Sequence, residues 1–278
     1  MALNPSAPTA RSAAAADAAA GTGTDITDWV RVHRPRPDAA VRLVCFPHAG
    51  GAASAFFPWA VALDDVEVLA VQYPGRQDRR AEPLVRDLAR LAALAAPVLS
   101  AALDDGRPYA FFGHSMGAAL AFEVARLLEA RGGGPSLLAV SGRRAPSLPA
   151  TIGPVVLGLD DPGLTAHLGD LSGTDPRLLA DPEIRQMILP VIRADLHAAE
   201  THLLPAGTAV AAPILALTGD DDPWATVTAA RAWAAHTTGG FEFRVLPGGH
   251  FYLVDNQREV LSLLTERTTA AAAGTRAP

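Results

Sequence analysis

Residues 109–128 read YAFFGHSMGAALAFEVARLL and set the architecture of the chain. The first four form an apolar run typical of a buried strand, and from Ala118 onward apolar residues recur at helical spacing. Gly113, Ser115 and Gly117 form a G-x-S-x-G motif between the two. We therefore expect Ser115 on a sharp strand-to-helix turn, facing an oxyanion at the helix start. A glycine-rich turn with a serine helix cap is the alternative, and the strand-turn-helix context favours a nucleophile.

The composition suits one large globular domain. The chain has 278 residues, of which 49% are hydrophobic, enough for a substantial core. Its net charge of −6 supplies no basic field for nucleic acid or for an anionic membrane, so we expect neither as a partner. We predict a monomeric cytoplasmic protein.

A single cysteine excludes an intramolecular disulfide framework and any site built from several cysteines. Cys45 lies in an apolar run, which indicates a buried strand thiol rather than a nucleophile. The longest apolar stretch, 88–103, is interrupted by Arg90 and Pro97, as in an internal helix.

Short apolar runs alternate with helical patterns between two alanine-rich ends. This alternation predicts an α/β fold with a mostly parallel central sheet and helices on both faces. The expected strands are 29–33, 41–46, 66–71, 108–113, 137–141, 213–218 and 241–246. The expected helices are 53–63, 84–103, 116–131, 224–236 and 256–268. Residues 1–28 and 268–278 lack periodicity and are predicted to be disordered tails.

Residues 145–205 break the alternation, because they contain helical patterns but no strand pattern. Asp181 and Pro182 are typical of a helix start, and the apolar run continues beyond Pro190. We predict a helical lid insertion that separates a first part of the core, 29–144, from a second part, 206–267.

A serine nucleophile needs a base and an acid that orients the base. On this topology the acid and then the histidine should follow the serine along the chain. His250 follows a late strand on a glycine loop and is the expected base. Asp222 is the preferred acid because the next residue, a proline, fixes the direction of its loop, and Asp220 and Asp221 remain alternatives.

Acyl transfer also needs two backbone N–H groups to stabilise an oxyanion. Met116, directly after the serine, is the first expected donor. The second should come from the loop after the strand 41–46, where Ala49 is preferred and Gly50 is the alternative. His48 in this loop and His114 beside the serine are expected to shape and pack the site.

Five motifs in this order resemble type II thioesterases, the stand-alone editing enzymes of polyketide and nonribosomal peptide synthesis. They are 46–51 (FPHAGG), 73–76 (YPGR), 113–117 (GHSMG), 219–223 (GDDDP) and 246–251 (LPGGHF). The similarity extends from about 41 to 264, including 178–201 of the lid. Each motif alone is widespread among α/β-hydrolases, whereas the ordered set is much narrower.

The resemblance implies an α/β-hydrolase fold and hydrolysis of acyl groups from the phosphopantetheine thiol of acyl or peptidyl carrier proteins. It implies that Ser115 attacks the thioester, that His250 transfers protons and that Asp222 orients His250, without a metal or another cofactor. Arg76 could meet the phosphate or carrier acids, or form a salt bridge that holds its loop. Met187 and His197 in the lid are expected to be packing residues.

Two other functions fit parts of the same pattern. A general serine carboxylesterase acting on small oxygen esters uses the same three residue types. A non-catalytic binding protein of this fold is the other alternative, and the complete Ser, Asp and His set argues against it.

Overall fold

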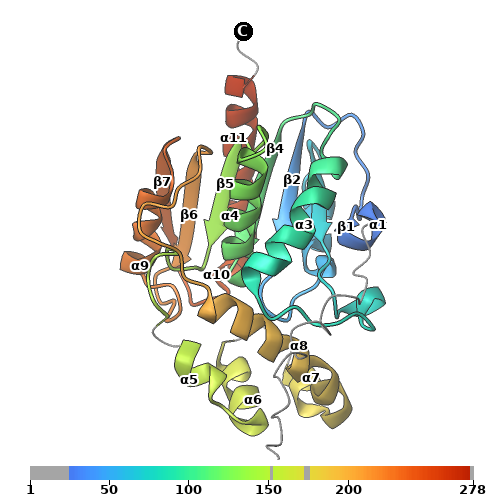
Figure 1. The fold of residues 1–278 in the computed structure, drawn as a ribbon, viewed down its shortest axis with the longest axis vertical. Helices are drawn as coiled ribbons and strands as arrows, with labels where there is room; N and C mark the ends of the chain where they lie inside the picture. The colour runs from blue at the N-terminus through green and yellow to red at the C-terminus, as the bar shows by residue number, and fades with distance from the viewer. Residues whose placement is uncertain (1–24, 151–152, 172–175, 276–278) are drawn as a thin grey trace, which may run out of the picture.

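The computed structural model describes residues 25–150, 153–171 and 176–275. A seven-stranded sheet forms its centre (Figure 1), with the strand order β1-β3-β2-β4-β5-β6-β7. The strands are β1 (Val30–Arg31), β2 (Val41–Phe46), β3 (Val66–Val71), β4 (Tyr109–His114), β5 (Leu137–Ser141), β6 (Ile214–Gly219) and β7 (Phe241–Leu246). All adjacent pairs are parallel except β1 and β3, which are antiparallel. Every predicted strand is present, with the first reduced to two residues.

The helices follow the predicted order with some boundaries shifted. They are α1 (Ile26–Trp29), α2 (Phe57–Ala62), α3 (Leu88–Ala102), α4 (Met116–Glu129), α5 (Gly153–Leu157), α6 (Asp161–Asp170), α7 (Pro176–Ala180), α8 (Pro182–Thr201), α9 (Val227–Arg231), α10 (Tyr252–Asp255) and α11 (Gln257–Thr275). Short 3₁₀ turns are η1 (Ala53–Phe56), η2 (Gln77–Arg79) and η3 (Ala232–His236).

Helices cover both faces of the sheet, as predicted. Along β2, Val44 and Phe46 belong to a core with α3 and α4, whereas Leu43 and Cys45 belong to a core with α2 and α11. Strand residues alternate between the two faces, so one buried strand supplies both cores. The predicted α/β class is therefore confirmed.

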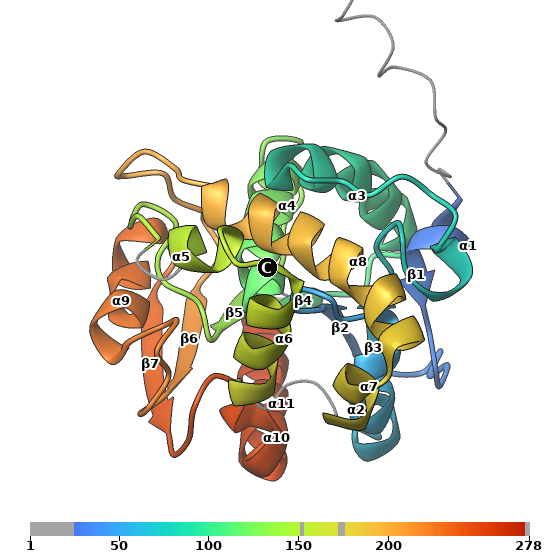
Figure 2. The same cartoon turned by 90° about the horizontal axis from the view of Figure 1, so that it is seen from below.

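The segment between β5 and β6 is helical in its described parts and contains α5, α6, α7 and α8. We call it the helical insertion. Asp181 caps α8 by accepting hydrogen bonds from the N–H groups of Glu183 and Ile184, as its sequence indicated. The helix continues past Pro190 and crosses the carboxyl ends of the strands (Figure 2). The parallel strands therefore point their carboxyl ends at the underside of α8.

Both predicted tail boundaries are wrong where the structure describes them. Asp25 caps α1, and Trp29 is buried beneath the Arg79 guanidinium, which lies 4.3 Å from the ring centroid. At the other end α11 runs to Thr275, because alanines favour a helix and Ala272 still packs on the core. Residues 1–24 and 276–278 of the predicted tails lie outside the described residues.

Candidate active site

Ser115 stands on the predicted turn between β4 and α4. Its backbone has φ 55° and ψ −117°, a left-handed conformation that is costly for a residue with a side chain. The flanking glycines are needed for close packing: a Cβ on Gly113 would lie 2.2 Å from the Gly117 carbonyl oxygen, and one on Gly117 would lie 2.0 Å from the Phe46 carbonyl oxygen. The turn thus presses against β2 while it holds the serine outward.

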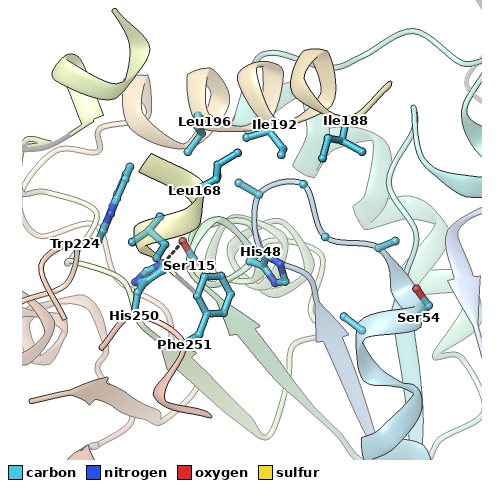
Figure 3. A pocket seen from close by; sticks show the side chains of 16 residues that line it. His48, Ser54, Ser115, Leu168, Ile188, Ile192, Leu196, Trp224, His250 and Phe251 are labelled. Carbon is cyan, nitrogen blue, oxygen red and sulfur yellow. Dashed lines mark hydrogen bonds between the residues drawn. The ribbon is translucent and has the colours of Figure 1, made fainter. Parts of the chain in front are cut away.

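The structure brings Ser115, His250 and Asp222 together. The Ser115 hydroxyl lies 3.0 Å from His250 Nε2 (Figure 3), and His250 Nδ1 lies 2.9 and 3.0 Å from the two Asp222 carboxylate oxygens. Both His250 and Asp222 are buried. The Asp222 carboxylate also accepts backbone hydrogen bonds from Trp224 at 2.8 Å and Ala225 at 3.1 Å, which fix its orientation.

The two alternative acids lie elsewhere on the same loop. Asp220 is exposed, and its carboxylate accepts the Gly248 N–H at 2.8 Å. Asp221 is also exposed and donates its backbone N–H to the Gly248 carbonyl at 3.1 Å. Both residues therefore tie the aspartate loop to the histidine loop, and only Asp222 contacts the imidazole.

The two candidate oxyanion donors flank the serine. Met116 is the first residue of α4, and Ala49 lines the same cavity as Ser115. Within the described residues, the Ala49 N–H has no acceptor. The N–H of the alternative, Gly50, is already bound, because it donates to Asp195 at 2.7 Å. The geometry therefore favours Ala49 over Gly50 as the second donor.

Hydrogen bonds hold the loop after β2 in place. The Tyr73 hydroxyl donates to the Pro47 carbonyl at 3.0 Å, and the Gly51 N–H donates to the His48 carbonyl at 2.9 Å. Gly50 has φ +75°, a left-handed conformation that glycine adopts without strain. These hydrogen bonds anchor Pro47 to the loop after β3 and fold the backbone from His48 to Gly51 into a turn.

His48 and His114 pack around the base. Desolvation by the surrounding protein, with smaller contributions from nearby imidazoles and, for His48, from Arg76, lowers the pKa of His48 to about 4 and holds the pKa of His114 well below its usual value. Both rings are therefore neutral at pH 7. His114 Nδ1 lies 2.9 Å from the Ser141 hydroxyl, and its ring lies 5.0 Å from that of His250. These contacts agree with the expected shaping and packing roles.

An apolar cavity of about 470 Å³ opens above the serine. Leu196, Ile192 and Ile188 project into it from α8, and Leu168 projects from α6 (Figure 3). Trp224 closes one end. The insertion therefore supplies much of the cavity wall.

Of the two expected roles of Arg76, the structure shows the salt bridge that holds its loop, with a partner on α8. Its guanidinium is buried and contacts the Asp195 carboxylate of α8. It is thus not available at the surface for a phosphate. Of the two lid residues expected to pack, His197 lies 3.1 Å from the Arg86 carbonyl, whereas Met187 is 67% exposed, so the packing prediction for Met187 is wrong. Cys45 is buried, as predicted, and burial raises its thiol pKa.

Trp224 and Asp195 lie at this site without having been predicted from the sequence. Trp224 follows Asp222 by two residues, so its place beside the base could have been inferred from the loop. Asp195 lies in the run 188–199, where most other residues are apolar or face the core. A lone acid at a core position of a helix indicates a buried partner, and that signal was available.

Across residues 25–150, 153–171 and 176–275, no helix is long and apolar enough to span a membrane. The same residues contain no group of three or more histidine, cysteine, aspartate or glutamate side chains arranged to hold a metal ion.

One known family matches most of the chain. The thioesterase domain family matches residues 41–268. The chain belongs to the thioesterase family. This thioesterase is 47% identical over 240 residues to thioesterase PikA5 of Streptomyces venezuelae. The match covers 86% of this chain and 84% of PikA5. It is a thioester hydrolase, as predicted.

Solved thioesterase structures share its fold. The type II thioesterase BorB from the borrelidin biosynthetic cluster is 45% identical, with a TM-score of 0.79, and the match covers 89% of this chain and all of BorB. YbtT, a type II thioesterase from a yersiniabactin pathway, is 33% identical, with a TM-score of 0.80 and coverage of 87% and 99%. The predicted α/β-hydrolase fold and the resemblance to type II thioesterases are confirmed.

Proposed function

We propose that this thioesterase removes acyl groups from the phosphopantetheine thiol of acyl or peptidyl carrier proteins, releasing stalled or misloaded chains. The observation that carries the proposal is the hydrogen-bonded chain Ser115–His250–Asp222, which opens into an apolar cavity beneath the helical insertion. BorB comes from a biosynthetic cluster and YbtT from a biosynthetic pathway, and both are type II thioesterases, which supports an editing role for this chain.

The hydrogen-bonding chemistry assigns the proton positions. An ionised Asp222 can only accept, so His250 carries its proton on Nδ1 and leaves Nε2 to accept the Ser115 hydroxyl proton. As that proton moves to Nε2, the serine oxygen bonds to the thioester carbon and the carbonyl oxygen becomes an oxyanion. Met116 and Ala49 donate their backbone N–H groups to it.

Collapse of this first intermediate breaks the carbon–sulfur bond. The proton on His250 Nε2 passes to the departing thiolate, and the acyl group remains on the Ser115 oxygen. Water then attacks the ester carbon while His250 takes a proton from that water. The second intermediate expels the serine oxygen, which recovers the proton, and the free acid leaves. Both half-reactions transfer only protons and the acyl group, so neither needs an oxidant or a reductant.

The cavity explains how a long thin substrate could fit. Its walls come from the insertion and from loops at the carboxyl ends of the strands, so an acyl-pantetheine arm would lie between α8 and the sheet. The helical insertion would act as a lid that excludes water from the acyl chain. We further propose that the enzyme is a cytoplasmic monomer whose partners are carrier proteins, not nucleic acids or membranes.

The deciding experiment compares two leaving groups on the same acyl chain. Propionyl carrier protein and propionyl p-nitrophenyl ester would be assayed with the wild type, Ser115→Ala and the control Asp221→Asn. We expect the wild type and the control to hydrolyse the carrier thioester, and Ser115→Ala to lose that activity by at least about 10³-fold. Turnover of the oxygen ester alone would identify a carboxylesterase and overturn the proposal.

A further inference from the structure

Asp195 is a buried acid that joins the helical insertion to the loop beside the serine. Its Oδ2 atom accepts the Gly50 N–H at 2.7 Å and contacts the guanidinium of Arg76. Arg76 in turn donates to the carbonyl oxygens of Gly51 at 3.2 Å and Pro74 at 2.7 Å. One carboxylate on α8 thus connects two loops that follow neighbouring strands of the sheet.

Helix α8 also packs directly on the same glycine. A Cβ on Gly50 would lie 2.6 Å from the Ile192 side chain, so that side chain fills the space above the loop. Ile192 and Asp195 are three residues apart and share one face of α8. A single turn of α8 therefore holds Gly50 by a van der Waals contact on one side and a hydrogen bond on the other.

A buried ion pair alone is a poor device for stability. The cost of removing both charges from water often equals their attraction, and apolar residues of similar volume commonly replace such pairs without loss. Here the carboxylate has an additional contact that an apolar residue could not make, namely the Gly50 N–H. That contact lies one residue from Ala49, whose N–H has no acceptor among the described residues.

We infer that Asp195 is a positioning residue for the oxyanion hole, because by binding Gly50 it fixes the loop that presents the Ala49 N–H to the reacting carbonyl. The inference rests on the proposed acyl-serine mechanism. The oxyanion hole then depends on the position of α8, because the Ala49 N–H is held in place only while Ile192 and Asp195 contact Gly50. Asp195 does not line the cavity above Ser115 and acts through the loop.

The test separates hydrogen bonding from packing and charge. Asp195→Asn keeps a carbonyl acceptor for Gly50, whereas Asp195→Leu has similar volume and no acceptor. Because either change leaves the Arg76 cation buried, the double variant Arg76→Met/Asp195→Leu removes both charges, and we expect it to fold. The matched control is Glu200→Gln. It weakens another buried ion cluster of α8, with Arg143 and Arg144, in the last turn of the helix and away from Gly50.

Each variant would be assayed for kcat and KM with propionyl-N-acetylcysteamine thioester and for the rate of Ser115 labelling by a fluorophosphonate. Loss of one oxyanion donor lowers kcat about 10²–10³-fold, so we expect the double variant to lose about 10- to 100-fold in kcat with KM within about threefold. The labelling rate should fall in parallel. Asp195→Asn should retain kcat within about fivefold of the wild type, and Glu200→Gln within about twofold.

Equal kcat values for Asp195→Asn and the double variant would overturn the inference, as would a loss matched by Glu200→Gln. The double variant decides the matter if Asp195→Leu does not fold. Labelling of Ser115 requires no thioester. A wild type that is labelled but does not hydrolyse carrier thioesters would therefore refute the proposed function, while the labelling rates would still test Asp195.

Discussion

The loop after β6 offers three consecutive aspartates, and substituting each by asparagine tests the assignment of the acid. Asp222 is 3% exposed and places both carboxylate oxygens within 3.0 Å of His250 Nδ1. An asparagine there could still accept the backbone N–H groups of Trp224 and Ala225 through its carbonyl. Its NH2 group would then face Nδ1.

This replacement changes the imidazole tautomer rather than the shape of the site. A donor opposite Nδ1 stabilises the ring with its proton on Nε2, which then points a donor at the Ser115 hydroxyl and cannot accept its proton. For serine hydrolases, this loss of the base lowers kcat by about 10⁴-fold, or roughly 5.5 kcal/mol of transition-state stabilisation. We expect a loss of about 10³- to 10⁴-fold for Asp222→Asn.

The neighbours should respond differently. Asp220→Asn keeps a carbonyl acceptor for the Gly248 N–H, so we expect at most about a tenfold loss from a looser histidine loop. Asp221→Asn changes an exposed side chain and should leave kcat within about twofold of the wild type. Steady-state kinetics on one acyl thioester, with circular dichroism to verify folding, gives the three values.

The ranking is the decisive result. If Asp222→Asn retained more than about a tenth of the wild-type kcat while Asp220→Asn or Asp221→Asn lost 10³-fold, the acid would be misassigned. If all three variants retained activity, the base would not depend on a carboxylate at this loop at all. Either result would refute the reasoning from the Nδ1 contacts.

Two further predictions concern stability. Gly117→Ala should destabilise the fold by at least about 3 kcal/mol or prevent folding, because the added Cβ would lie 2.0 Å from the Phe46 carbonyl oxygen. Urea unfolding measures this loss. A free energy of unfolding within about 1 kcal/mol of the wild-type value would contradict the packing of the turn. His48 has a pKa of about 4 in the folded protein and about 6.5 in the unfolded chain. Between pH 6.5 and pH 4 the unfolded chain therefore binds a proton at His48 that the folded protein does not. The free energy of unfolding should fall as the pH drops through this range. His48→Leu should reduce that fall by about 3 kcal/mol in unfolding titrations, and an unchanged pH dependence would show that His48 is not buried as a neutral ring.

Much of the fold could be predicted from local sequence. The strands β2, β3 and β5 begin and end at the predicted residues, because a buried parallel strand is mostly apolar on both faces. The ends of the chain were harder. Formation of α1 within the predicted tail and continuation of α11 depend on contacts with distant segments, and an alanine-rich sequence fits both a tail and a helix.

The sequence could predict those site residues whose side chains are brought together only by the position of their loops at the ends of the strands. Ser115, Asp222 and His250 each follow a strand of one parallel sheet, so their carboxyl-end loops converge at the same edge. The pairing of Arg76 with Asp195 could not be predicted in this way. It depends on how α8 crosses the strands, and the packing angle of an inserted helix is set by contacts far apart in the sequence.

The central claim is that Ser115 carries the acyl group during turnover. Rapid acid quench during hydrolysis of a propionyl carrier protein, followed by peptide mapping by mass spectrometry, tests it directly. We predict a propionyl ester on the peptide that contains Ser115, formed at a rate no slower than kcat and absent from Ser115→Ala. A propionyl group on another residue, or a Ser115→Ala enzyme that turns over at the wild-type rate, would contradict the covalent mechanism.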